Sequence, residues 1–321
     1  WLAFGTGTLW PARVVTVTHA ILGIAMLALV PWKQLIARRG LGRPGGGSRG
    51  VAIKASSVLL ALSVVVSLIA GFAHSYAGPR TYFGVTAMQV HVGAAIVAAL
   101  MFVVHVVTRP QRVRATDLSR RNVFRLVGLV AVAGLSYAAV EGLASVARLP
   151  GRRRRATGSY ETGTDDPAAM PLTSWLFDTI PSIEPGAYTL RVRDGGGART
   201  VGYDELADGT DTVRAVLDCT GGWYAAQDWR GVRLDRLLPD IPAGHVIEVM
   251  STTGYRRRFP AGEASSLWLA THMAGVPLDA GHGAPVRLVA PDRRGFWWVK
   301  WVASIDAVAG EDWWQSPFPL Q

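Results

Sequence analysis

Cysteine is almost absent from this sequence: Cys219 is the only one among 321 residues. A single cysteine excludes an intrachain disulfide, so the residue needs another explanation if its surroundings are oxidising. It lies in "VRAVLDCTGGWYAAQDWRGV", residues 213–232, between a β-like run and several tryptophans. A free cysteine most often serves as a small buried apolar residue, but a thiolate is also a soft ligand for a transition metal.

Charged residues are also scarce, at 17%, whereas hydrophobic residues make up 50%. This composition is too apolar for an ordinary soluble chain of this length and predicts a membrane part. Four apolar runs are long enough to cross a bilayer of about 30 Å at about 1.5 Å per residue. They lie near 14–32, 55–73, 86–107 and 123–147. None resembles a removable signal peptide. Because the sequence starts with Trp1, we expect a segment upstream of it.

Basic residues are concentrated in two of the connections, 33–54 and 108–122, while the 74–85 connection has only Arg80. The positive-inside rule therefore places the two basic connections in the cytoplasm and the C-terminal half outside it. The run "GRRRRA", 151–156, opposes this orientation, but long domains cross membranes largely regardless of charge. The net charge of +10 comes without a nucleic-acid-binding motif, so we expect no nucleic-acid partner.

From about residue 157 the sequence changes to short β-like runs separated by Gly, Pro and Asp. The runs are "YTLRVRD", "TVRAVLDC", "GHVIEVMS", "PVRLVAP" and "WWVKWVASI". The predicted fold is therefore multi-domain, with an all-α transmembrane four-helix bundle followed by an α+β, β-rich domain. We predict the bundle at 1–148, a linker rich in Gly, Arg, Thr and Asp at 149–175, and the extracytoplasmic domain at 176–321.

Four histidines lie in the membrane half, where ionisable residues are costly and point to function. His91 and His105 are 14 positions apart, which places them within about 40° of one helix face and about 21 Å apart along the axis. One helix could thus provide an axial ligand for a b-type haem near each leaflet. His19 lies at a depth similar to that of His91 and is the preferred partner, with His74 as the alternative ligand. A partner for His105 would have to come from an upstream helix or a partner subunit; otherwise the inner haem does not exist. The competing interpretation is that these histidines serve packing or the membrane interface.

These histidine motifs, "HAILG" and "HVGAAIVAALMFVVH", resemble bacterial membrane cytochrome b modules of the b561 type. The second half resembles the sulfite-oxidase-type molybdopterin-binding domain, through "LDCTGGWYAAQDWRGV" and "MAGVPLDAGHGAPVRLVAPDRRGFWWVKWVASI". The resemblance implies a fused redox protein that binds molybdenum-molybdopterin outside the membrane and one or two haem b groups within it.

The resemblance also implies roles for individual residues. Cys219 would ligate molybdenum and be the catalytic residue, with Trp223 as a neighbour. The residues expected to contact the pterin or its phosphate are Thr252, His282, Arg287, Trp298, Val299 and Lys300. Ser251 and Thr253 compete with Thr252 for its role. A pterin with a phosphate requires cations and hydrogen-bond donors, which these residue types supply.

The function predicted from these features is that of a membrane-anchored molybdenum oxidoreductase that exchanges electrons with quinone through b-type haem. Its substrate is either a small oxyanion such as sulfite or, alternatively, a sulfoxide. The sequence does not decide between the two. Sulfite would require several arginines around the metal, and the aim of Arg256, Arg257 and Arg258 is not evident. Two alternatives are a metal-free, membrane-tethered binding or assembly module and a haem electron-transfer protein that docks a separate partner.

Overall fold

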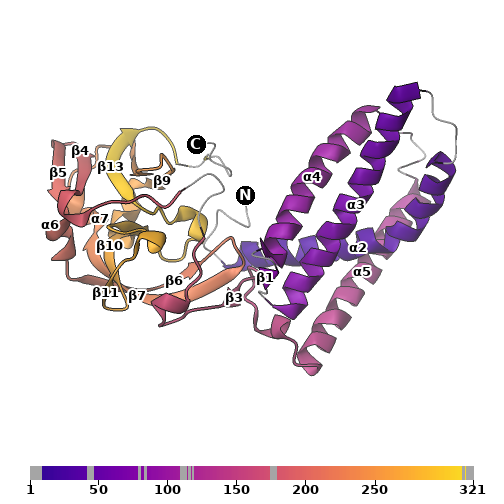
Figure 1. Ribbon diagram of the computed structural model, residues 1–321, viewed down its shortest axis with the longest axis horizontal. Helices are drawn as coiled ribbons and strands as arrows, with labels where there is room; N and C mark the ends of the chain where they lie inside the picture. The colour runs from indigo at the N-terminus through magenta and orange to yellow at the C-terminus, as the bar shows by residue number, and fades with distance from the viewer. Residues whose placement is uncertain are drawn as a thin grey trace. The chain divides into compact units, whose positions relative to one another are not determined.

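The computed structural model describes residues 9–41, 47–78, 81–82, 85–108, 114, 117, 119–173, 179–312 and 315. It divides into a helical unit, Arg13–Gly158, and a β-rich unit that begins at Ser159 (Figure 1). Four long apolar helices come first in the chain, and the strands of two larger sheets follow them. This order confirms the predicted fold class. The domain and linker borders remain a prediction.

The helical unit is built on four helices, α2 (Leu9–Leu41), α3 (Gly47–Ala77), α4 (Ala87–Thr108) and α5 (Arg120–Val146). Each contains a stretch long and apolar enough to cross a membrane. Large apolar side chains on them are exposed, among them Phe124 (75%) and Leu135 (73%). Exposed apolar surface on this scale is typical of a lipid-facing protein. The two helices α2 and α3 extend into the basic connection predicted at 33–54, because Lys, Arg, Leu and Ala are good helix formers.

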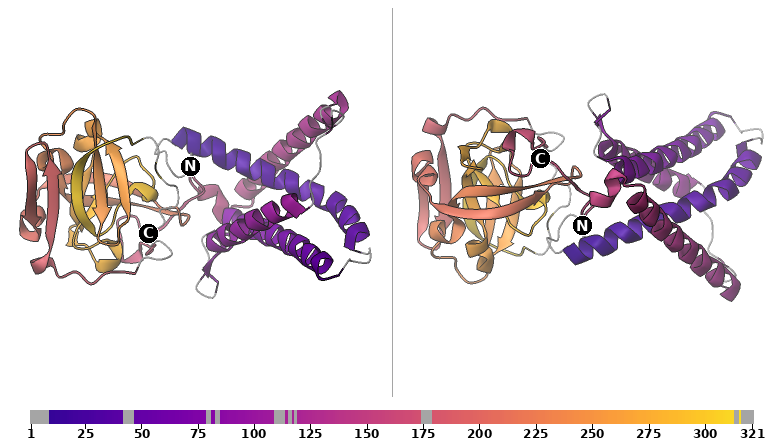
Figure 2. Two further views of the ribbon diagram at one scale, coloured as in Figure 1. Left: turned by 90° about the horizontal axis from the view of Figure 1, so that it is seen from above. Right: turned by 90° about the horizontal axis from the view of Figure 1, so that it is seen from below.

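Helices α3 and α4 lie along each other (Figures 1 and 2) and are joined through a short hairpin of β1 (Thr81–Tyr82) and β2 (Val85–Thr86). Polar contacts connect the ends of α3 and α5 to the segment that follows. The Tyr76 hydroxyl donates to Glu141 Oε1 at 2.9 Å, and Arg154 forms an ion pair with the same carboxylate. Arg154 also donates to the carbonyl oxygen of Ser75. Arg154 therefore joins the ends of α3 and α5, and its charge is balanced by Glu141.

The β-rich unit contains two larger sheets. In the six-stranded sheet, β7 (Trp223–Arg233) and β10 (Trp268–Met273) are paired at the centre. The other strands of this sheet are β3 (Tyr160–Glu161), β6 (Asp211–Asp218), β11 (Val276–Pro277) and β12 (Arg287–Val289). The five-stranded sheet has the order β5 (Gly197–Gly202), β4 (Thr189–Asp194), β13 (Val302–Ala309), β8 (His245–Ser251), β9 (Arg256–Pro260). Two short helices, α6 (Tyr203–Ala207) and α7 (Leu234–Leu237), complete the unit.

The core of this unit consists of apolar residues that alternate with more exposed ones along the strands, as in β4 and β7. Fully buried members from different strands include Leu190, Ile247, Phe259, Leu269 and Leu288. These side chains form one continuous cluster that also contains Cys219. The core therefore places the lone cysteine at the edge of packed apolar material.

Residues of the predicted linker pack within the β-rich unit, and one predicted strand begins later than expected. Part of the predicted linker is ordered within the β-rich unit, because β3 pairs with β7 and Met170 is buried in the core. The run "WWVKWVASI" becomes a strand only from Val302. Trp301 has a φ of 51°, in the left-handed region, which interrupts the extended backbone before that point. The residues directly before Val302 are therefore not part of the strand, and their side chains can line a pocket.

Candidate active site

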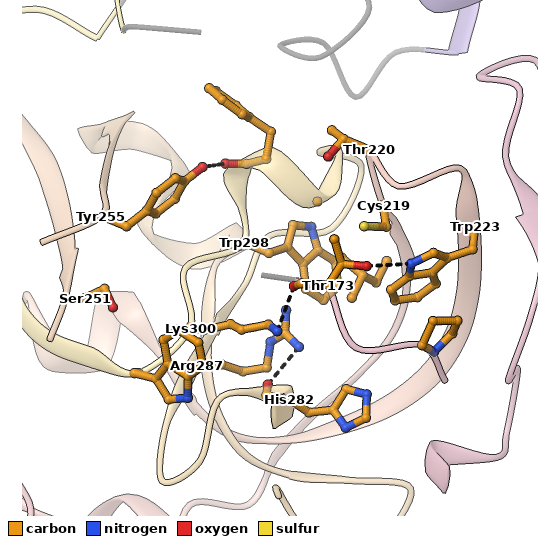
Figure 3. Close-up of a pocket in the computed structure, with 15 residues that line it drawn as sticks. Thr173, Cys219, Thr220, Trp223, Ser251, Tyr255, His282, Arg287, Trp298 and Lys300 are labelled. Atoms are coloured by element: carbon orange, nitrogen blue, oxygen red, sulfur yellow. Dashed lines mark hydrogen bonds between the residues drawn. The ribbon is translucent and has the colours of Figure 1, made fainter. Parts of the chain in front are cut away.

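A pocket in the β-rich unit brings together most of the residues predicted for the molybdenum site (Figure 3). Cys219, His282, Arg287, Trp298 and Lys300 all contribute to its lining. The remaining lining residues are Pro171, Thr173, Leu217, Thr220, Trp223, Ser251, Tyr255, Gly295, Phe296 and Trp301. The predicted site residues thus come from segments far apart in the sequence and meet at one place.

Cys219 lies in a tight turn between β6 and β7. Its N–H donates to the carbonyl of Trp223 at 2.8 Å, and the φ of 89° at Gly222 is one that glycine adopts without strain. The Sγ atom accepts a hydrogen bond from the Gly221 N–H at 3.3 Å. Burial raises the pKa of the Cys219 thiol, although the Gly221 N–H, the Thr173 hydroxyl and the Lys300 and Arg294 cations act against this rise. A bound metal cation would supply the positive charge that a buried thiolate needs.

Arg287, on β12, provides a buried cation in the same pocket. Its side chain stacks on the rings of Trp229 and Trp298, at 4.9 and 5.3 Å from their centroids. Nη1 donates to the carbonyl of His282 at 3.0 Å, whereas Nε has no hydrogen-bond partner within the described part of the chain. Burial lowers the pKa of Arg287 to about 10. An unsatisfied donor on a buried cation fits an anionic ligand such as a pterin phosphate.

His282 and Lys300 are held by backbone carbonyls around the pocket and, for His282, also by the carboxylate of Asp279. The ring of His282 contacts Asp279 Oδ2 through Nδ1 at 2.5 Å and the carbonyl of Met170 through Nε2 at 3.2 Å. Lys300 Nζ donates to the carbonyls of Gly281 (2.6 Å) and Thr173 (2.9 Å). These bonds fix both side chains on the pocket lining.

Thr252 and Val299 do not line the pocket. Thr252 is exposed, and Ser251, which was its competitor in the sequence analysis, occupies the lining instead. Successive residues of an extended chain point to opposite sides, so the inward position at the end of β8 is Ser251. Val299 is fully buried, and its carbonyl accepts a hydrogen bond from the N–H of Leu288 at 2.7 Å. It supports the strand next to the pocket.

The helical unit brings two of its predicted haem ligands together. The imidazole rings of His19 and His91 have centroids 5.7 Å apart and an interplanar angle of 81°. Nδ1 of His91 contacts the carbonyl and the hydroxyl of Ser67 at 2.8 and 3.1 Å. A histidine held through one ring nitrogen presents the other to a metal, and this arrangement is usual for histidine ligands.

The other two histidines of the helical unit have different surroundings. His74 is buried, and its Nε2 lies 3.2 Å from the carbonyl of Gly158. Nδ1 of His105 lies 3.4 Å from the hydroxyl of Ser57. Of the two candidates for the partner of His91, the structure thus brings His19 into ring contact and gives His74 a contact with the chain after α5.

Comparison with known proteins gives the β-rich unit a family. Residues 177–314 match the family described as "Oxidoreductase molybdopterin binding domain". The unit carries a sulfite-oxidase-family molybdopterin domain.

The protein-methionine-sulfoxide reductase catalytic subunit MsrP of Xanthomonas campestris pv. campestris is 30% identical over 175 residues, which are 46% of this chain and 50% of that protein. Mitochondrial sulfite oxidase of Rattus norvegicus is 26% identical over 177 residues, covering 42% of this chain and 32% of the oxidase. The structure of the sulfane dehydrogenase SoxCD from Paracoccus pantotrophus gives 23% identity over 40% of each chain, with a TM-score of 0.38. The chain spans half or less of the length of these relatives.

Several lining residues of the molybdopterin domain were missed by the sequence analysis. Thr173 accepts a hydrogen bond from Trp223 Nε1 at 3.0 Å, and it comes from the predicted linker. Tyr255 and Phe296 were not singled out either. Thr173 has no sequence signal because its segment is irregular. Tyr255 could have been found from its position directly before a strand that begins with three arginines.

Proposed function

We propose that the protein is a membrane-anchored, molybdenum-dependent oxidoreductase that exchanges electrons with quinone through b-type haem. The observation that carries the proposal is the pairing of Cys219 with Arg287, a buried cation with an unsatisfied Nε, in one pocket. Molybdenum-molybdopterin, when bound, supplies two-electron oxygen-atom transfer. Cys219 would ligate the metal, Arg287 would pair with the anionic part of the pterin, and Lys300 and His282 would orient it.

For the substrate we propose a sulfoxide. Arg287 and Lys300 are the arginine and lysine of the pocket lining formed by the described residues, both are assigned above to the pterin, and most other lining residues are apolar or aromatic. Of the three consecutive arginines, Arg256 is exposed, Arg257 lies outside the lining, and Arg258 pairs with Glu248 at 2.8 Å. A dianion such as sulfite would need several cations, whereas a neutral sulfoxide with apolar arms suits aromatic walls. The MsrP relatives, which are methionine sulfoxide reductases by name, support the same choice.

For the haem we propose His19 and His91 as axial ligands. The contact between their rings and the support of His91 by Ser67 favour this pair. Gly71 adds space for a close approach, because a Cβ at this position would lie 2.9 Å from Nδ1 of His91. A second haem at His105 would require a ligand from an upstream helix or a partner subunit. Quinone would reach the haem from the surrounding lipid.

The proposal is tested by measuring metal content and a reduced-minus-oxidised optical spectrum on the purified wild type and on Cys219→Ser. We expect stoichiometric molybdenum and a b-type α-band in the wild type, and reduced or altered molybdenum in Cys219→Ser with the α-band retained. The wild type should reduce methionine sulfoxide and oxidise sulfite poorly. A protein that binds neither metal would favour the binding-module interpretation, and sulfite turnover without sulfoxide turnover would reverse the substrate assignment.

A further inference from the structure

Arg257 is a second buried arginine of the molybdopterin domain, and the proposed reaction does not use it. It lies on β9, where exposed and more buried residues alternate: Arg256 is exposed and Arg257 is 3% exposed. Within the described part of the chain it has no ion pair, and its Nη2 has no hydrogen-bond partner. Burial lowers the pKa of Arg257, which reflects the cost of placing a cation there. Such a cost calls for a compensating role.

The contacts of Arg257 are with two aromatic residues that line the pocket. Its guanidinium lies 4.4 Å from the ring centroid of Tyr255 and 3.7 Å from that of Phe296. Nε donates to the Tyr255 hydroxyl at 3.0 Å and to the carbonyl of Phe296 at 3.1 Å. The Tyr255 hydroxyl in turn donates to the same carbonyl at 2.5 Å. Arg257 therefore connects Tyr255, directly before β9, to the 3-10 helix Gly295–Trp297, which carries Phe296.

Tyr255 and Phe296 form one aromatic wall of the pocket. Their rings are in edge-to-face contact, with centroids 6.5 Å apart and an interplanar angle of 84°. In the view of Figure 3, Tyr255 lies on one side of Trp298 and Cys219 on the other. A sulfoxide that brings its oxygen to a metal held by Cys219 would have an organic arm available to contact such a wall. Aromatic rings contribute large apolar contact area and favour apolar or aromatic arms.

We propose that Arg257 is a positioning residue that fixes the Tyr255–Phe296 wall and thereby selects sulfoxides with a bulky apolar or aromatic arm. The inference rests on the proposed function for its substrate class. Arginine suits the role because its planar group stacks on a ring while its N–H groups reach two acceptors. Lysine retains the charge but provides neither the planar surface nor the fixed directions of the donors.

The test compares Arg257→Lys with Arg256→Lys, a matched substitution at the exposed neighbour. Dissociation constants are measured on the holoenzyme without turnover, from tryptophan fluorescence, with methyl phenyl sulfoxide and dimethyl sulfoxide. For methyl phenyl sulfoxide we expect the Kd to rise about tenfold in Arg257→Lys, from the loss of a stacked cation and a charged hydrogen bond at the wall. The Kd for dimethyl sulfoxide and the molybdenum content should change little, and Arg256→Lys should match the wild type.

Tyr255→Phe provides a second variant if Arg257→Lys fails to accumulate, because it keeps both the ring and the buried cation but removes the hydroxyl. We expect a smaller change in the same direction, with a raised KM and little change in kcat for the bulky sulfoxide. The inference would be overturned if both ligands bound equally more weakly, or if the preference for methyl phenyl sulfoxide over dimethyl sulfoxide did not change. Loss of molybdenum from Tyr255→Phe would also overturn it, as would a wild type that does not prefer the bulky ligand. A wild type that binds methyl phenyl sulfoxide selectively but reduces no sulfoxide would refute the proposed function and leave the role of Arg257 intact.

Discussion

Two guanidinium groups, of Arg257 and Arg287, are buried against aromatic rings of the molybdopterin domain. Neither has an ion pair among the residues that the structure describes. Burial of an unpaired charge is unfavourable unless ring contacts and hydrogen bonds offset it. The two differ in position, because Arg287 lines the pocket and Arg257 lies outside the lining. One is therefore available to an anion in the pocket, and the other acts on the wall.

The carboxylate of Asp279, which contacts the pocket residue His282, gives the stability of the fold a dependence on pH. It accepts hydrogen bonds from the N–H of His282 at 2.9 Å and contacts the His282 ring at 2.5 Å. Burial opposes ionisation of Asp279, but these bonds outweigh it and leave the pKa of Asp279 below its ordinary value. A carboxylate whose pKa is lower in the folded state than in the unfolded chain stabilises the fold above the unfolded pKa of about 3.9, and this contribution disappears as the pH falls through the folded pKa.

We therefore expect the free energy of unfolding to fall more steeply in the wild type than in Asp279→Asn between about pH 5 and about pH 3. Above this range Asp279→Asn should be the less stable protein, because a neutral amide is a weaker acceptor than a carboxylate. Urea unfolding of the detergent-solubilised protein, followed by tryptophan fluorescence at several pH values, measures this difference. Parallel curves for the two proteins would show that Asp279 contributes no pH-dependent stability.

At the scale of the elements, α2, α3 and α4 determine which histidines could share the proposed haem. Helix α2 carries His19, α4 carries His91, and α3 holds the His91 ring through Ser67. His74, near the end of α3, contacts the carbonyl of Gly158 instead.

We expect His91→Ala and His19→Ala to lose the α-band, because each would remove an axial ligand. His74→Ala should retain it, and reduced-minus-oxidised spectra of the three purified variants provide the measurement. Loss of the band in His74→Ala alone would make His74 the ligand.

The four long helices could be predicted from the sequence because a membrane span needs a minimum apolar length. Their ends could not, since α2 continues to Leu41 through basic residues that favour a helix as much as a loop. In the second half, Cys219, His282, Arg287, Trp298 and Lys300 lie within recognisable motifs, and the pocket contains all of them. Thr173 could not be found, because its place depends on packing of an irregular segment. The sequence could not choose between Ser251 and Thr252, because the choice depends on which of the two points inward at the end of β8.

At the scale of the whole molecule, the basic run after α5 is the main conflict with the predicted orientation. One of its arginines, Arg154, forms an ion pair with Glu141 and has only 13% of its side chain exposed. Its charge is thus neutralised within the helical unit, which reduces the weight of this run in the positive-inside rule. The basic connections at 33–54 and 108–122 then predict an orientation with the molybdopterin domain outside the cytoplasm.

This orientation can be tested with single introduced cysteines, because the native Cys219 is buried at 8% exposure and gives a low background. Thr200, on β5, and Gln34, on α2, are both exposed. We expect a membrane-impermeant maleimide to label Thr200→Cys in intact cells and Gln34→Cys only after permeabilisation. The opposite pattern would place the molybdopterin domain in the cytoplasm. In that case the run of arginines after α5, and not the two earlier connections, would set the topology, and the sulfoxide substrate would have to be a cytoplasmic one.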